Sequence, residues 1–287
     1  GPHPFWGGRP QALHVSIETA RQDMFELLLD WGADVDGSND GYEQSSPLML
    51  TFLWKQPEMS EALLARGAKV ALVEALLMGD DDLVARLLRR SGPDLGKLRP
   101  NGGSILAMAR TPFAIDRLLE LGAPRELPDR WSTSPLEAMS RLGPAGRRLY
   151  RHLLAKGFEA NVQEYARMGD RESLACIFDA DPARVTAHEV LAEAAGFGHH
   201  KLVEWLLARS AHVNSDRAGA WSALHSAAWE GDMRMVKLLV EAGANVHARE
   251  SAHNATPAGV ARAAIEVTNN PACEGVADYL DGVAGLD

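Results

Sequence analysis

The stretch from Trp221 to Glu250, WSALHSAAWEGDMRMVKLLVEAGANVHARE, has the pattern of two short amphipathic helices joined by a tight turn. Ser222 precedes the first helix and Asp232 precedes the second, and both residue types cap helix starts with a side-chain oxygen. Gly243 follows the second helix, where a left-handed residue commonly ends a helix and glycine has no Cβ to clash. The stretch therefore predicts a helix–turn–helix unit.

Variants of this unit recur along the chain, each with a second helix that ends at a glycine or a serine. These terminating residues are Gly32, Gly67, Gly122, Gly157, Ser210 and Gly243. They lie 33 to 35 residues apart where adjacent copies are well preserved. A fixed period of this length is typical of proteins that stack identical small units.

Residues 222–246 agree with the pattern T-P-L-H-x-A-A-x-x-G-H-x-x-x-V-x-x-L-L-x-x-G-A at most of its fixed positions, and the chain resembles the ankyrin repeat family. Looser copies lie at 11–35 and 189–213. The resemblance implies an all-α fold, an ankyrin-repeat solenoid of stacked helix–turn–helix units with loop tips and a concave face.

We expect residues 1–8 to be a tag remnant with a short N-terminal extension, and residues 9–285 to form a single ankyrin-repeat domain. About nine repeats are predicted, several of them degenerate, at 9–41, 42–69, 70–99, 100–127, 128–158, 159–185, 186–218, 219–251 and 252–285. The third and sixth repeats lack the Thr-Pro-Leu-His start but keep the helical period. The ninth carries an insertion, IEVTNNPACEG, which suits a terminal cap whose outer face meets water.

Composition restricts the class of partner. Acidic residues outnumber basic ones 39 to 29, and no run of five or six like charges is present, so we expect no nucleic-acid partner. The two cysteines match no metal spacing, and no apolar run reaches the length of a membrane span, so we expect no cofactor, no metal and no membrane anchor. We expect a cytoplasmic monomer. The excess of arginine over lysine, 23 to 6, points to a GC-rich and bacterial genome.

Four histidines are candidates for catalysis or metal binding, but the resemblance gives most of them a structural position. His14 and His225 fill the Leu-His position, where the resemblance implies that the imidazole joins neighbouring repeats. His199 fills the Gly-His position, and we expect His200 to face solvent. Adjacent histidines on a helix point about 100° apart and do not easily share one metal ion. Neither a strained nucleophile elbow nor a phosphate loop with its Lys-Ser/Thr is present.

Positions that the family leaves variable are candidates for partner contact. On the first helices and loop tips they include Glu18, Tyr42, Glu74, Trp131, Glu164, Glu193, Trp221 and Trp229. Aromatic anchors among a few charges are typical of protein-binding surfaces. The sequence thus predicts a protein–protein interaction scaffold that binds a partner protein or peptide, a basic one, on an acidic and aromatic concave face. In the structural alternative, these aromatics pack on the neighbouring repeat and the glutamates are only solvated.

An enzyme remains an alternative. Glu164 and Glu193 occupy equivalent positions in neighbouring repeats, about 10 Å apart if the helices pack normally. Two carboxylates at that distance could act as acid and base on a small molecule, with help from His225. This alternative requires a deep pocket at the two carboxylates. A third possibility is an effector or inhibitor that masks a partner enzyme. It would bind its partner through the same kind of surface as the scaffold.

Overall fold

The computed structural model describes residues 11–37, 45–91, 95, 98, 103–125, 134–186, 188–215 and 217–285. All regular structure in these ranges is α-helical or 3-10 helical, and none of it is a strand, so the predicted all-α class is confirmed. We expected one domain over 9–285; by its contacts the chain forms two compact units, Gly1–Phe158 and Glu159–Asp287. They are called the N-terminal and C-terminal units. Two predicted contact residues, Tyr42 and Trp131, lie outside the described residues.

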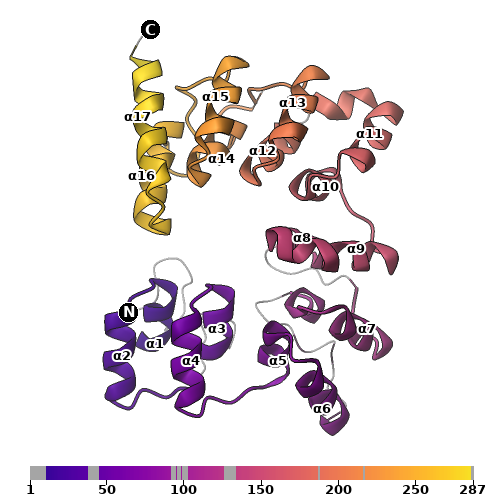
Figure 1. The fold of residues 1–287 in the computed structure, drawn as a ribbon, viewed down its shortest axis with the longest axis vertical. Coiled ribbons are helices and arrows are strands. Elements are labelled where there is room, and N and C mark those ends of the chain that lie inside the picture. The colour runs from indigo at the N-terminus through magenta and orange to yellow at the C-terminus, as the bar shows by residue number, and fades with distance from the viewer. Residues whose placement is uncertain are drawn as a thin grey trace. The chain divides into compact units, whose positions relative to one another are not determined.

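The N-terminal unit is a row of helix pairs (Figure 1). The pairs are α1 (Ala12–Glu18) with α2 (Gln22–Asp30), α3 (Pro47–Leu53) with α4 (Pro57–Ala65), α5 (Leu72–Met78) with α6 (Asp81–Ser91), η3 (Ile105–Met108) with α7 (Pro112–Glu120), and α8 (Pro135–Ser140) with α9 (Arg147–Ala155). A short 3-10 turn, η4 (Gly143–Gly146), separates α8 from α9. The first members contact one another in the order α1, α3, α5, η3 and α8, as expected for stacked repeats.

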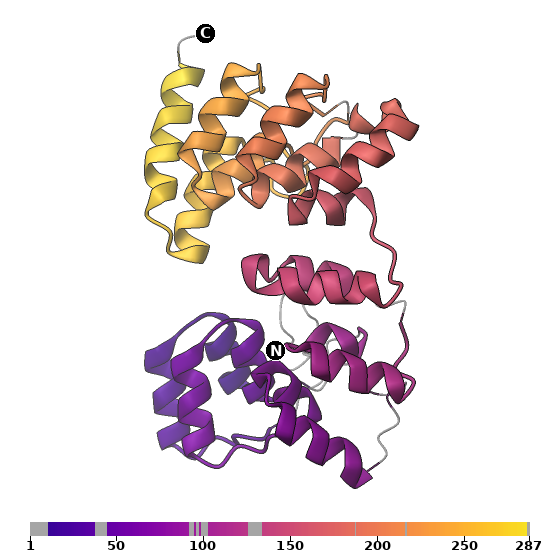
Figure 2. The ribbon, with the colours of Figure 1, turned by 45° about the vertical axis from the view of Figure 1, so that its right-hand side comes forward.

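The C-terminal unit repeats the arrangement. Its pairs are α10 (Val162–Met168) with α11 (Arg171–Ala180), α12 (His188–Gly196) with α13 (His200–Ala208), α14 (Ala223–Glu230) with α15 (Met233–Glu241), and α16 (Pro257–Thr268) with α17 (Ala272–Ala284). A 3-10 turn, η5 (Pro182–Thr186), follows α11. The first helices contact in the order α10, α12, α14 and α16, and Figure 2 shows each beside its second helix.

Six of the second helices, α2, α4, α7, α9, α13 and α15, end as the sequence predicts, at residues in the left-handed region. Five of these residues are glycines with φ between +80° and +88°: Gly32, Gly67, Gly122, Gly157 and Gly243. Ser210 takes φ +66° at the same position although it carries a Cβ. The helices also begin as predicted, because Asp80, Asp170 and Asp232 each accept a backbone N–H from three residues on, at 2.9 to 3.1 Å.

Each unit buries leucine-rich faces between neighbouring pairs. In the N-terminal unit, Leu13, Phe25 and Leu63 belong to one cluster that joins the first two pairs. In the C-terminal unit, a larger cluster runs from α10 to α17 and includes Leu206 and Leu239. Burying such a side chain completely contributes about 1.5 to 3 kcal/mol. Stability therefore comes from contacts between adjacent pairs, as in other stacked-repeat folds.

The fourth pair departs from the regular pattern, because its first helix is only the four-residue η3. Thr111 caps α7 and Pro112 opens it, so little chain is left for a full first helix. Arg110 closes the end of η3, where its Nη1 donates to the carbonyls of Ala107 and Ala109 at 3.0 Å. Burial lowers the pKa of the Arg110 guanidinium to about 10.

Candidate functional site

An aromatic pair flanks α14. Trp221 lies just before the helix, and its indole N–H donates to the Ser226 hydroxyl at 2.9 Å. Its ring meets Trp229 edge-on, with centroids 6.4 Å apart, and lies tilted against His225 at 5.5 Å. Trp229 is half-buried against the core cluster, whereas Trp221 remains 40% exposed. The contacts therefore fix an exposed indole in one orientation.

His225 is a structural residue. Its Nδ1 accepts the backbone N–H of Ser222 at 3.2 Å, so its Nε2 carries the proton and donates to the carbonyl of Ala255, also at 3.2 Å. His14 makes the equivalent bond to the carbonyl of Ser45 at 3.0 Å. Burial lowers the pKa of both imidazoles, which favours their neutral forms. The predicted role of these histidines, joining neighbouring repeats, is confirmed.

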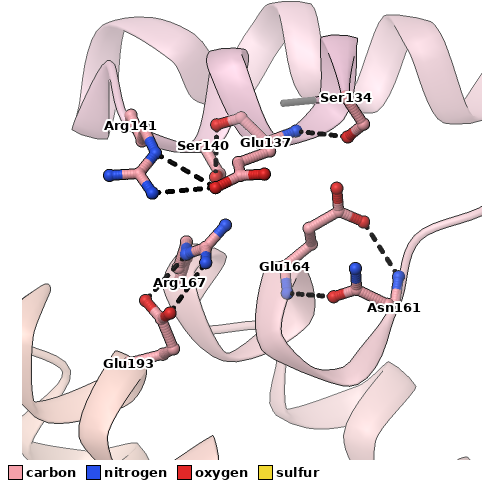
Figure 3. A network of polar contacts seen from close by, with 8 residues as sticks. All are labelled: Ser134, Glu137, Ser140, Arg141, Asn161, Glu164, Arg167 and Glu193. Carbon is pink, nitrogen blue, oxygen red and sulfur yellow. Dashed lines mark hydrogen bonds and ion pairs between the residues drawn. The ribbon is translucent and has the colours of Figure 1, made fainter. Parts of the chain in front are cut away.

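Two of the predicted contact glutamates hold helix starts instead of facing a partner. Glu74 is buried, and its carboxylate accepts the backbone N–H of Ala71 at 3.1 Å and the hydroxyl of Ser46 at 2.6 Å. Glu164 is buried as well, and its carboxylate accepts the backbone N–H of Asn161 at 2.9 Å (Figure 3). In return, the Asn161 side chain accepts the backbone N–H of Glu164 at 2.8 Å. This reciprocal capping box fixes the first turn of α10.

Glu193 is engaged by an arginine of the neighbouring first helix. Arg167 donates from Nε and from Nη2 to the two carboxylate oxygens of Glu193, each at 2.7 Å (Figure 3). This bidentate geometry is among the strongest that side-chain ion pairs form. Glu164 in a capping box and Glu193 in an ion pair therefore both have structural partners. Glu18, the last residue of α1, is half-buried.

The two successive loops before α14 and α16 form an open pocket next to Trp221, whose chain neighbours Ala220 and Ser222 line it. Its volume is about 370 Å³, and its lining includes Asn214, Ser215, Arg217, Ser222, Asn245, His247 and Arg249. The loops are joined by hydrogen bonds from Asn245 N–H to the Asn214 side chain at 2.7 Å and from Ser251 N–H to the Gly219 carbonyl at 2.9 Å. Sequence reasoning missed this pocket because it depends on how successive loops stack.

The remaining histidine predictions give one correction. His199 is structural as predicted, with its Nε2 2.6 Å from the carbonyl of Arg167. His200 does not face solvent; it is half-buried and its Nε2 lies 2.8 Å from Asp232. Within the described ranges, His, Cys, Asp and Glu form no group of three suited to a metal ion. In the same part of the chain, helices of sufficient length and apolarity to cross a bilayer are absent.

Charge is divided unevenly between the two units. Residues 159–287 contain 19 acidic and 10 basic side chains, whereas residues 1–158 contain 20 and 19. Nearly all of the net charge of −10 therefore belongs to the C-terminal unit. On α14, Glu230 is exposed and directly follows Trp229.

Paired helices, left-handed terminating residues and stacked loops define a helical repeat protein. Residues 164–250 match the family model of ankyrin repeats in three copies, so this part of the chain consists of ankyrin repeats. Among solved structures it is similar to the human ASB11 ankyrin repeat domain, at 20% identity over 88% of this chain and 91% of that chain, with a TM-score of 0.29. No curated protein matches the sequence. Ankyrin repeats are in general protein–protein interaction modules.

Proposed function

We propose that this chain is a scaffold that binds a basic segment of another protein at an aromatic edge of its C-terminal unit. The edge consists of Trp221 and Trp229, with the adjoining loop pocket. The observation that carries the proposal is the exposed indole of Trp221, held in place by Ser226 and Trp229. Tryptophan is enriched among the few residues that dominate binding energy at protein interfaces.

The rigidity of the pair favours binding. An interface side chain that is ordered only on binding loses about 0.5–1.5 kcal/mol of conformational freedom. Trp221 avoids most of this loss because a hydrogen bond and two ring contacts already fix it. Its exposed face can therefore contribute to affinity without a large ordering penalty.

Charge selects the kind of partner. The C-terminal unit has 19 acidic and 10 basic side chains, and a surface of that sign attracts basic segments and repels acidic ones. Three predicted glutamates each lie five residues before the left-handed glycine between paired helices: Glu74, Glu164 and Glu193. They contribute little, because Glu74 and Glu164 cap helices and Glu193 pairs with Arg167. Of the predicted contact residues, the proposal therefore rests on Trp221 and Trp229.

A peptide-display selection tests the proposal. The probe is a library of random linear peptides, selected on the wild-type chain and counter-screened on the double variant Trp221→Ala/Trp229→Ala. We expect the enriched peptides to be rich in Lys and Arg, to lose at least tenfold in affinity for the double variant, and to bind more weakly as salt is raised.

Trp54→Ala is the matched control. Trp54 belongs to the N-terminal unit and is 44% exposed, close to the 40% of Trp221, so its removal changes a similar amount of indole surface. The control should bind the selected peptides as the wild type does. Enriched peptides that bind the double variant and the wild type equally would contradict the proposed site, and enrichment of acidic peptides would contradict the proposed charge.

A further inference from the structure

The second helix of the first pair carries an uncovered apolar stripe. Met24, Leu27 and Trp31 follow one another at helical spacing on α2 and its C-cap, and they are 42%, 41% and 77% exposed. Residues three, four and seven apart lie on one side of a helix. Phe25 and Leu29, on the opposite side, are buried in the core cluster. α2 is thus apolar on two sides, and only one is covered.

Two positions on this side of α2, those of Met24 and Leu28, are covered in other pairs of this chain. Met24 lies eight residues before the left-handed Gly32, and its equivalents in five other pairs are at most 4% exposed: Met59, Ala114, Leu149, Leu202 and Met235. Leu28, four residues before Gly32, is half-buried, whereas its equivalents Leu63, Leu118, Leu153, Leu206 and Leu239 are all 0% exposed. Among the described residues, the side of α2 that carries Met24 therefore lacks the cover that the equivalent positions have in other pairs.

Trp31 alters the chemistry of this surface. In three other pairs, the residue just before the left-handed position is a cation that reaches a carboxylate of the preceding pair: Arg66 to Asp30, Lys156 to Asp116, and Arg209 to Asp179, at 2.7 to 2.9 Å. Trp31 replaces that cation with an exposed indole. This end of the row thus suits an apolar partner surface better than a carboxylate-bearing one.

The opposite end of the chain does not complement the stripe. The last helix, α17, exposes Glu274, Asp278 and Asp281 at helical spacing. Asp281 pairs with Arg262. An indole and two aliphatic side chains placed against Glu274 and Asp278 would bury these carboxylates against apolar groups, which is unfavourable. Head-to-tail stacking of chains is therefore disfavoured, and the stripe matches a surface like itself.

We propose that the stripe of Met24, Leu27 and Trp31 joins two copies of this chain through a two-fold axis. The N-terminal unit, with 20 acidic and 19 basic side chains, meets its own copy almost without net repulsion. The strongly acidic C-terminal unit would repel a copy of itself. In a two-fold interface each residue meets the same surface of the other copy, so the apolar stripe complements itself.

The geometry of the contact follows from the stripe. Two α2 helices crossing antiparallel about their midpoints place Leu27, the central residue, opposite Leu27 of the other copy, with Trp31 near the partner's Met24. Three side chains are fewer than the 20 to 30 residues per side of a standard stable interface. We therefore expect a reversible dimer with a dissociation constant on the order of micromolar or weaker.

Sedimentation velocity over a concentration series tests the dimer. We expect the mass of the wild-type chain to rise with concentration from the monomer value of 31.1 kDa toward twice that value. Trp31→Glu should raise the dissociation constant at least tenfold. Trp54→Glu, which changes an exposed tryptophan of the same unit outside the stripe, should not. Circular dichroism checks that each variant keeps its helices.

A charge-reversal pair tests the two-fold geometry. Leu27→Lys alone and Leu27→Glu alone should both remain monomeric, because like charges meet at the axis. An equimolar mixture of the two should associate, because each Lys then meets a Glu. A wild-type chain that stays at 31.1 kDa at hundreds of micromolar would overturn the proposal, as would a mixture that fails to associate. Neither outcome bears on the proposed function, which concerns the C-terminal unit.

Discussion

At the scale of single residues, Ser210 stores backbone strain. It takes φ +66° where the other well-preserved pairs have glycine, and a residue with a Cβ pays about 1–2 kcal/mol in the left-handed region. Replacing Ser210 by glycine removes this strain, but the greater freedom of glycine in the unfolded chain offsets part of the gain in stability, about 0.4–1 kcal/mol. We therefore expect Ser210→Gly to raise the free energy of unfolding by about 0.5–1 kcal/mol in urea titrations.

The reverse change at an equivalent position provides the control. Gly243 has φ +88° with open space around the place of a Cβ, so Gly243→Ala adds strain without a clash. It should destabilise the chain where Ser210→Gly stabilises it. A neutral or destabilising Ser210→Gly would show that the left-handed backbone at this position is not a source of strain.

The buried histidines His14 and His225 make folding sensitive to acid. Burial lowers the pKa of each below its ordinary value of 6.5, so the unfolded chain binds protons more readily than the folded one. The stability that the neutral rings contribute is present above pH 6.5 and is lost as pH falls below it. We expect the free energy of unfolding to decrease between pH 7.5 and 5.

His225→Gln separates this effect from general acid sensitivity. The glutamine variant should be less stable than the wild type at pH 7.5, because the bonds of the ring to Ser222 and Ala255 are changed. Its stability should nevertheless fall less steeply toward pH 5. Equal slopes for variant and wild type, measured by urea midpoints, would rule out His225 as a source of the pH dependence.

Sequence alone could predict part of the residue-scale picture. The roles of His14 and His225 followed from their position in a repeat. The capping box of Asn161 and Glu164 was also readable, since Asn followed three residues later by Glu is a helix-start pattern. The bond between Ser46 and Glu74 was not, because it joins residues 28 apart whose approach depends on how the repeats stack.

At the scale of helices, α10 depends on the carboxylate that sequence reasoning offered as a contact or catalytic residue. Glu164→Ala removes the acceptor of the Asn161 N–H, so we expect a loss of about 0.5–2 kcal/mol in the free energy of unfolding. Glu164→Gln keeps an acceptor oxygen and should lose less. A Glu164→Ala variant as stable as the wild type would contradict the capping role.

Helix boundaries were predictable wherever caps and terminating residues are preserved. Asp80, Asp170 and Asp232 begin second helices, and the predicted left-handed residues follow the ends of α2, α4, α7, α9, α13 and α15. The fourth pair was harder, because nothing local distinguishes the four-residue η3 from a full first helix. Its length is limited by the cap of α7 at Thr111, which leaves only Ala109 and Arg110 between the end of η3 and the cap.

At the scale of the whole molecule, the period predicted the fold class, whereas the division into two units and the position of the site needed the structure. The boundary after Phe158 coincides with a predicted repeat boundary, yet nothing in the repeat pattern sets it apart from the others. The overall acidity was visible in composition. That the glutamates of one repeat position are buried or paired depends on contacts between repeats, which a single sequence does not display.

Calorimetric titration with the most enriched display peptide measures whether Trp221 and Trp229 anchor a basic partner. Removing an anchor tryptophan typically costs 2 kcal/mol or more. We predict that Trp221→Ala and Trp229→Ala each weaken binding at least tenfold while Trp54→Ala leaves it unchanged. If Trp221→Ala and Trp229→Ala both bind the peptide with wild-type affinity and keep the wild-type unfolding temperature, neither tryptophan is an anchor.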